Sequence, residues 1–167
     1  MKYVDYIVVG GGISGSVLSY TLMKYGASVH MFDLPLENHS SVVASGLWNP
    51  VVLKRMKKVW KADEMIETLQ RVYPAMEKWT GNKFYQPLPI RRVFHSAGEQ
   101  NQWVAQSDHP SFSRYLEEDI SSVPEHIIAQ HGSGLMKQTG RVKVNTMLAA
   151  VRGNLEASGN FTEAKFN

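Results

Sequence analysis

The sequence contains no cysteine, and this absence excludes disulfide bonds, thiolate nucleophiles and cysteine-held metal ions together. The six histidines are scattered along the chain. No pair of them has metal-ligand spacing with a carboxylate, so we expect no metal site. No local signature of a Ser-His-Asp arrangement is present either. The sequence therefore identifies no catalytic residue.

Long apolar runs and a strong charge of one sign are also missing. No run reaches the roughly 18 apolar residues that indicate a membrane span. Asp5 interrupts the N-terminal apolar stretch, and no small-residue cleavage site precedes the first glycines, which argues against a signal peptide. The formal net charge of +3 suits an anionic cofactor but is too small to argue for nucleic acid alone. We expect a cytoplasmic protein without membrane contacts.

An ordered strand, loop, helix and strand occupy the first 33 residues. Residues 3–9 are almost continuously apolar and β-branched, which predicts a strand buried on both faces. A G-x-G-x-x-G sequence follows at residues 10–15, with a further glycine in its second position. A helical pattern begins at Ser14 and ends near Gly26, and a second strand covers residues 28–32, with Asp33 at its end.

This arrangement is typical of a dinucleotide-binding βαβ unit. Gly10 permits a tight turn, Gly12 lets the backbone approach a pyrophosphate, and Gly15 lets the helix pack closely on the strand. The N-terminus of the helix presents free N–H groups and a positive dipole end to phosphates. Asp33 lies where an acid hydrogen-bonds an adenosine ribose, and its charge disfavours NADP.

The segment 38–50 favours FAD over NAD. It is rich in small residues, and its Ser40, Ser41, Ser45 and Gly46 offer hydroxyl and backbone donors to a ligand. A plain NAD domain would have another short βα unit at this place. A long loop of small residues instead suits a ligand that extends further across the sheet.

These segments resemble the N-terminal half of the D-amino-acid oxidase/glycine oxidase family of FAD-dependent oxidoreductases. The resemblance rests on residues 5–15, 32–33, 40–46 and 49–50. It implies that the glycines face the FAD pyrophosphate, that Asp33 faces the adenosine ribose, and that residues 40–47 lie beside the pyrophosphate, ribityl chain and flavin ring. The cofactor-binding residues predicted in this way are Gly10, Gly12, Ile13, Ser14, Gly15, Asp33, Leu34, Ser40, Ser41, Ala44, Ser45, Gly46 and Leu47.

Beyond residue 50 the sequence predicts elements without a chemical motif. Residues 62–79 have the pattern of an amphipathic helix, which Pro74 should kink or break. Arg91 and Arg92 point to opposite faces of a strand, so at most one could bind a substrate carboxylate, and a structural salt bridge or a solvated arginine is the simpler interpretation. The other predicted elements are strands at 84–95, 127–129, 141–144 and 161–166, helices at 99–106, 110–118 and 145–157 with Asn145 as N-cap, and a turn at 132–134.

The predicted fold class is α/β, a Rossmann-like FAD/NAD(P)-binding domain with the beginning of an α+β substrate domain. We expect residues 1–80 to form the FAD-binding portion, 82–144 a partial substrate domain, and 145–167 the return to the FAD-binding domain. Members of the family are about twice as long, so we expect a truncated or partial chain that is inactive alone and self-associates through exposed apolar surface. In the family the substrate is an amine or amino acid. An NAD-binding dehydrogenase domain and a non-catalytic nucleotide-binding or interaction module remain alternatives.

Overall fold

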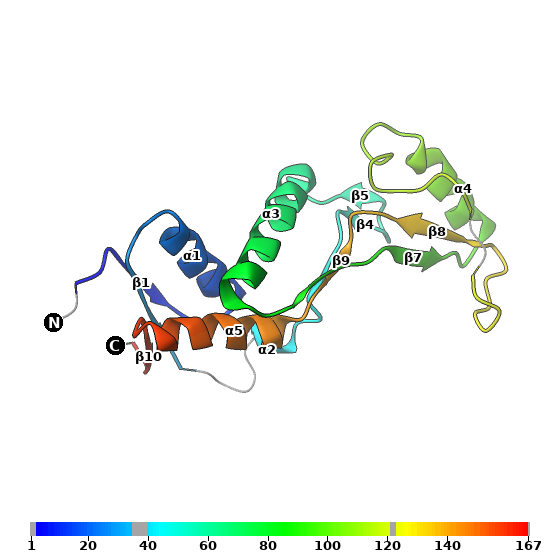
Figure 1. The fold of residues 1–167 in the computed structure, drawn as a ribbon. Helices are drawn as coiled ribbons and strands as arrows, with labels where there is room; N and C mark the ends of the chain where they lie inside the picture. The colour runs from blue at the N-terminus through cyan, green and yellow to red at the C-terminus, as the bar shows by residue number, and fades with distance from the viewer. Residues whose placement is uncertain (1–2, 35–39, 121–122, 167) are drawn as a thin grey trace. The chain divides into compact units, whose positions relative to one another are not determined.

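A computed structural model describes residues 3–34, 40–120 and 123–166. Helices and strands alternate in a mixed α/β arrangement, which confirms that part of the predicted fold class (Figure 1). The chain forms two compact units. The first unit draws on Met1–Gly46, Val72–Tyr85 and Val142–Asn167, and the second on Leu47–Arg71 and Gln86–Arg141. The functional portions predicted from the sequence have other boundaries, because they assign residues 47–71 to the cofactor portion.

The elements follow one another in the order drawn in Figure 1. The helices are α1 (Ile13–Lys24), α2 (Ser40–Val43), α3 (Ala62–Thr80), α4 (Ala97–Ser107) and α5 (Val144–Ala157). The strands are β1 (Tyr6–Val9), β2 (Val29–Asp33), β3 (Leu47–Trp48), β4 (Val51–Val52), β5 (Lys57–Lys58), β6 (Tyr85–Pro87), β7 (Ile90–Val93), β8 (Ser133–Met136), β9 (Gly140–Val142) and β10 (Phe161–Glu163).

A parallel sheet with the order β1-β2-β10 lies in the first unit. Tyr6 is paired with Val29 at the start of β1 and β2, and Glu163 of β10 is paired with Asp33 at the end of β2. Parallel neighbours require crossover connections, which α1 supplies between β1 and β2. The last strand is shorter than the predicted 161–166. Its pairing with β2 returns the chain to the sheet that contains β1.

The prediction that the first strand is buried on both faces is wrong. Only Val8 is buried in it, while Tyr6, Ile7 and Val9 are 50%, 55% and 59% exposed. The apolar run predicts a strand covered on both faces, but β1 lies at the edge of this sheet. The burial of an apolar strand depends on neighbours that local sequence cannot specify.

Helix α1 ends as the sequence predicts. Gly26 has a φ of 88°, and its N–H donates to the carbonyl of Met23, while the N–H of Ala27 donates to Leu22. This pair of bonds is a Schellman motif, which satisfies carbonyls left free at the helix end. The helix buries Ser16, Ser19 and Tyr20, and it leaves the apolar Leu18 49% exposed. The packing face therefore combines two small serines with the large ring of Tyr20.

Close contact between α1 and the turn before it depends on Gly15. A Cβ atom at this position would collide with the carbonyl oxygen of Gly10 and would also reach a Val8 methyl group at 3.4 Å. Gly10 itself has a φ of 100°, a region that side chains rarely adopt. The predicted role of Gly15 in close helix packing is confirmed by this geometry.

We predict that Gly15→Ala destabilises the protein by several kcal/mol, since the turn and helix must separate to admit the methyl group. Gly153→Ala is the matched control, because Gly153 lies inside α5 with no atom within 4 Å of an added Cβ. There alanine should stabilise the helix by about 0.5–1 kcal/mol. Urea unfolding of both variants tests the pair, and equal effects would contradict the packing argument.

Glu77 secures the end of α3 within the first unit. Its carboxylate accepts hydrogen bonds from the backbone N–H groups of Phe84 at 2.7 Å and Tyr85 at 2.9 Å, and it pairs with Lys83 at 2.9 Å. Its side chain is 5% exposed. Burial alone would raise the pKa of Glu77, but the bonds from Tyr85, Lys83 and Phe84 outweigh it and lower the pKa.

The lowered pKa of Glu77 predicts a pH dependence of stability. A carboxyl group with a depressed folded-state pKa contributes stability above its ordinary pKa and loses it as pH falls through the folded value. Glu77→Gln should cost about 1–3 kcal/mol at neutral pH, and the cost should shrink in acid. Urea unfolding across the acid range measures this difference. A cost that does not change with pH would show that the charge of Glu77 does not matter.

The second unit has its own apolar core and short antiparallel sheets. Strand β3 pairs with β9, β4 with β5, and β7 with β8. Ser96 is the N-cap of α4, and its hydroxyl accepts from the N–H of Glu99 at 3.2 Å. Trp103 of α4 packs against Gly134 of β8, where any side chain would meet the indole ring. The buried core residues are Val51, Ala62, Phe94, Trp103, Phe112, Tyr115, Leu116 and Met136.

Several predicted elements differ from those observed. Residues 110–118 form turns instead of a helix, and 127–129 do not form a strand. The predicted turn at 132–134 mostly belongs to β8, where Gly134 avoids Trp103. Helix α3 continues through Pro74, so the proline does not break it. Lys143, and not Asn145, is the N-cap of α5. At Gly134 and at the buried Phe112 and Tyr115, tertiary packing outweighs local propensity.

Candidate functional site

A cavity of about 270 Å³ lies within the first unit. The glycine loop, β2, β10, α2 and α5 all contribute to its walls. Its size is near the lower end of the roughly 300–1,000 Å³ found for ligand pockets, so it suits part of a larger ligand. The lining residues are Gly11, Gly12, Ser16, Met31, Asp33, Val42, Asn145, Leu148, Ala149, Arg152 and Phe161.

The N-terminus of α1 faces this region with hydrogen-bond donors. The first turn contains no acidic residue, so no side-chain charge there cancels the positive end of the helix dipole. The N–H of Ile13 donates to the hydroxyl of Ser41 at 3.2 Å. Gly12 is close to the same hydroxyl, because a Cβ there would lie 2.9 Å from it. The glycine loop and the start of α1 therefore contact α2 through the hydroxyl of Ser41.

Asp33 ends β2 directly beside the glycine loop. A Cβ on Gly11 would lie 2.7 Å from a carboxylate oxygen of Asp33, so a side chain there would force the carboxylate to move. The backbone carbonyl of Asp33 accepts from the N–H of Ala164 at 3.1 Å. The structure thus brings the helix N-terminus and the carboxylate to one cavity. Such a combination can hold the phosphates and ribose of a nucleotide.

One face of α5 forms a wall that sequence reasoning missed. Its lining residues recur at helical spacing, namely Asn145, Leu148, Ala149 and Arg152. The neighbouring face packs inward through Met147, Val151 and Leu155, all at 0% exposure. The i, i+3, i+4, i+7 spacing was readable in the sequence, but nothing there showed that this face would meet the glycine loop.

The predicted cofactor residues are distributed unevenly around the cavity. Gly12 and Asp33 line it, whereas Gly10, Ile13, Ser14 and Gly15 form the adjoining turn and the first turn of α1. Ser40 and Ser41 belong to α2, Leu34 is 43% exposed, and Leu47 belongs to the second unit. Ala44 and Ser45 are exposed between α2 and Gly46.

The predicted loop 38–50 contains regular structure. Helix α2 and strand β3 interrupt it, and Asn38 and His39 lie outside the described residues. Gly46 has a φ of 71° and sits against the carbonyl oxygen of Val142, whose N–H donates to Gly46 at 2.9 Å. Gly46 is therefore required by backbone packing on β9.

Over residues 3–34, 40–120 and 123–166, no helix is both long enough and apolar enough to cross a membrane. In the same described part of the chain, no three His, Cys, Asp or Glu side chains come together as a metal-binding group.

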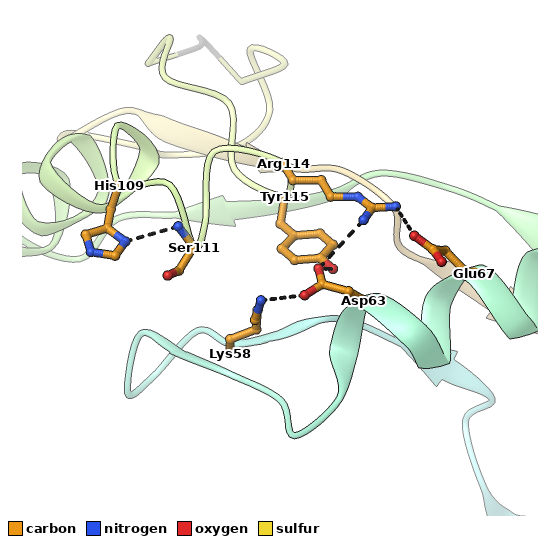
Figure 2. A network of polar contacts seen from close by, with 7 residues as sticks. All are labelled: Lys58, Asp63, Glu67, His109, Ser111, Arg114 and Tyr115. Atoms are coloured by element: carbon orange, nitrogen blue, oxygen red, sulfur yellow. Dashed lines mark hydrogen bonds and ion pairs between the residues drawn. The ribbon is translucent and has the colours of Figure 1, made fainter.

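A second polar cluster lies in the second unit, around the start of α3 (Figure 2). Asp63 pairs with Lys58 at 2.6 Å and accepts a short hydrogen bond from the hydroxyl of Tyr115. Arg114 pairs with Glu67 at 3.1 Å and approaches Asp63 at 3.8 Å. Burial and the bond to Asp63 raise the pKa of Tyr115 to about 12. The cluster ties α3 to the turns that precede Leu116.

We predict that Asp63→Asn lowers the pKa of Tyr115 from about 12 toward its ordinary value, because the negative acceptor is removed while burial remains. An ultraviolet titration of phenolate, with Tyr115→Phe used to assign the signal, measures the shift. Glu64→Gln on the same helix is the control and should leave the titration unchanged. An unaltered curve in Asp63→Asn would mean that burial alone sets this pKa.

Both candidate arginines of the second unit have structural partners. Arg91 donates to the Ser133 hydroxyl at 2.8 Å, and Arg92 pairs with Glu99 at 3.1 Å. Glu99 also accepts from the N–H of His95 at 3.1 Å, which holds the ion pair at the start of α4. These contacts agree with the structural interpretation of the two arginines.

The fold resembles that of several solved oxidases and deaminases, although no family model matches the sequence. Glycine oxidase from Bacillus cereus has a TM-score of 0.67 at 19% identity, covering 96% of this chain and 46% of that one. Iminodiacetate oxidase from Chelativorans sp. has a TM-score of 0.72 at 11% identity. The match covers 96% of this chain and 47% of the oxidase. L-amino acid deaminase from Proteus myxofaciens has a TM-score of 0.70 at 14% identity. The match covers 98% of this chain and 38% of the deaminase.

The chain therefore spans less than half the length of these solved structures. At these identities the likeness establishes a shared fold. It fits the N-terminal portion of the family that the sequence resembles, the D-amino-acid oxidase/glycine oxidase family.

Proposed function

We propose that the first unit is a Rossmann-like, FAD-binding portion of an oxidoreductase that acts on an amine or amino acid. The observation that carries this proposal is the meeting of the α1 N-terminus and Asp33 at one cavity. The oxidase and deaminase names of the similar structures support the same class. Residues 82–144 would then contribute part of a substrate domain, and residues 145–167 would complete the cofactor portion.

The residues present fit the parts of a dinucleotide. The N–H groups of the first α1 turn suit the pyrophosphate, because no acidic side chain stands among them. The Asp33 carboxylate can accept hydrogen bonds from a ribose diol and would repel a 2′-phosphate. Gly10, Gly12, Ile13, Ser14 and Gly15 would bind by backbone contact.

The remaining predicted residues would serve the middle of the cofactor. Leu34 and the set Ser40, Ser41, Ala44, Ser45, Gly46 and Leu47 are proposed here as contacts to the pyrophosphate, ribityl chain and flavin. Ser41 has the clearest support, since its hydroxyl already touches Ile13 at the helix N-terminus.

Bound flavin would supply the chemistry, which is acceptance of a hydride from the substrate amine. The chain's own residues would bind and orient the cofactor, and we assign none of them a catalytic role. We also assign none of the described residues a substrate contact. We therefore expect no turnover from this chain alone.

The direct test is the absorbance spectrum of the purified chain after incubation with FAD and removal of free ligand. Flavin bands that co-elute with the protein would support the proposal. Parallel samples with NAD⁺ and NADP⁺ test the dehydrogenase alternative. Retention of NAD⁺ without FAD would overturn the choice of cofactor, and retention of no nucleotide would favour a non-catalytic interaction module.

Asp33→Ala should weaken FAD binding by about 10- to 100-fold, which corresponds to the loss of roughly 1.5–3 kcal/mol from charged hydrogen bonds. Fluorescence titration of FAD against protein measures the affinity. Asp119→Asn, at an exposed carboxylate of the second unit, is the control and should bind FAD normally. Unchanged affinity in Asp33→Ala would remove this residue from the site.

A further inference from the structure

Arg152 lines the same cavity as Asp33, although no sequence motif includes it. Its guanidinium carbon lies 4.6 Å from the centre of the Phe161 ring, which also lines the cavity. A guanidinium over an aromatic ring is a favourable cation–π contact. Arg152 and Phe161 therefore form one stacked pair in the cavity wall.

Two carboxylates hold this guanidinium in place. Arg152 pairs with Glu156 one turn further along α5, at 2.9 Å, and forms a short ion pair with Glu163 of β10. The Arg152 side chain is 28% exposed, so it is partly withdrawn from water. With contacts to both carboxylates and to the Phe161 ring, the flexible arginine side chain is constrained before any ligand arrives.

The charge balance selects against a phosphate at this point. Two carboxylates surround one guanidinium, and Asp33 adds a third negative group to the same region. An anion would gain little from Arg152 under these conditions. A flat aromatic ring without charge would instead gain stacking with the guanidinium plane and apolar contact with Leu148 and Ala149.

Sheet register connects this wall to the ribose site. Glu163, the anchor of Arg152, is the parallel-strand partner of Asp33, and Phe161 is the partner of Met31. Neighbouring parallel strands lie about 4.8 Å apart, so the groups at these paired positions belong to one local site. A base attached to a ribose at Asp33 would reach the Arg152–Phe161 pair.

We propose that Arg152 is a positioning residue for the adenine base, which packs against the guanidinium that Phe161 and Glu163 hold in place. The inference rests on the proposed function, because it assumes a nucleotide whose ribose is bound by Asp33. It adds the recognition of the base, which neither the glycine loop nor Asp33 supplies.

Arg152→Met tests this role with two probes that differ by the base. AMP carries adenine, and ribose 5-phosphate does not. Replacing arginine with methionine keeps an unbranched side chain but removes the guanidinium. We expect AMP binding to weaken by about tenfold and ribose 5-phosphate binding to stay unchanged. Isothermal titration calorimetry on the full chain measures both affinities.

Two further variants separate base contact from general damage. Arg152→Lys keeps the positive charge but lacks the planar group, so it should also lose affinity for AMP. Arg71→Met, at an exposed arginine of α3, should behave as wild type. Melting curves of each variant report folding. A purely structural role of Arg152 would weaken both probes equally, and that outcome would overturn the inference.

The outcomes distinguish this inference from the proposed function. If the wild-type chain binds FAD and Arg152→Met binds AMP as wild type does, the base-positioning role is wrong and the proposed function stands. If the wild-type chain binds neither FAD nor AMP, the proposed function itself fails. Selective loss of AMP affinity in Arg152→Met and Arg152→Lys supports both.

Discussion

The first unit depends on one close approach, that of Gly15 in α1 to the carbonyl oxygen of Gly10. Because no side chain intervenes, the helix starts immediately after β1 and its N-terminus stays at the carboxyl end of the parallel strands. Asp33 ends the neighbouring strand at the same edge, close enough for its carboxylate to touch Gly11. A methyl group at position 15 would therefore push the start of α1 away from the turn that carries Gly11 and Gly12.

Segments distant in the sequence complete the cavity that this approach creates. Helix α5 presents Asn145, Leu148 and Arg152 to it, while β10 pairs in parallel with β2 and places Glu163 beside Asp33. Arg152 links these two elements through its ion pair with Glu163. The wall is thus built from the ion pairs of Arg152, its contact with the Phe161 ring, and the register of β10 on β2.

Local signals predicted the beginning of the chain well and its middle poorly. The order strand, glycine loop, helix and strand over residues 6–33 was readable because each glycine and cap has a local conformational cause. The helix predicted at 110–118 is wrong, because Phe112 and Tyr115 are buried from turns. The prediction that β1 is buried on both faces is also wrong, because burial depends on neighbouring strands and β1 lies at the sheet edge.

The sequence by itself determined the glycine turn, the helix that follows and the carboxylate at the end of β2. These features follow from backbone conformation within a few residues of each position. Only the tertiary structure decided that α5 covers the site, that Glu163 lies beside Asp33, and that Gly46 packs against Val142. Those contacts join residues about a hundred or more positions apart, and no local propensity or spacing encodes which distant face will meet the loop.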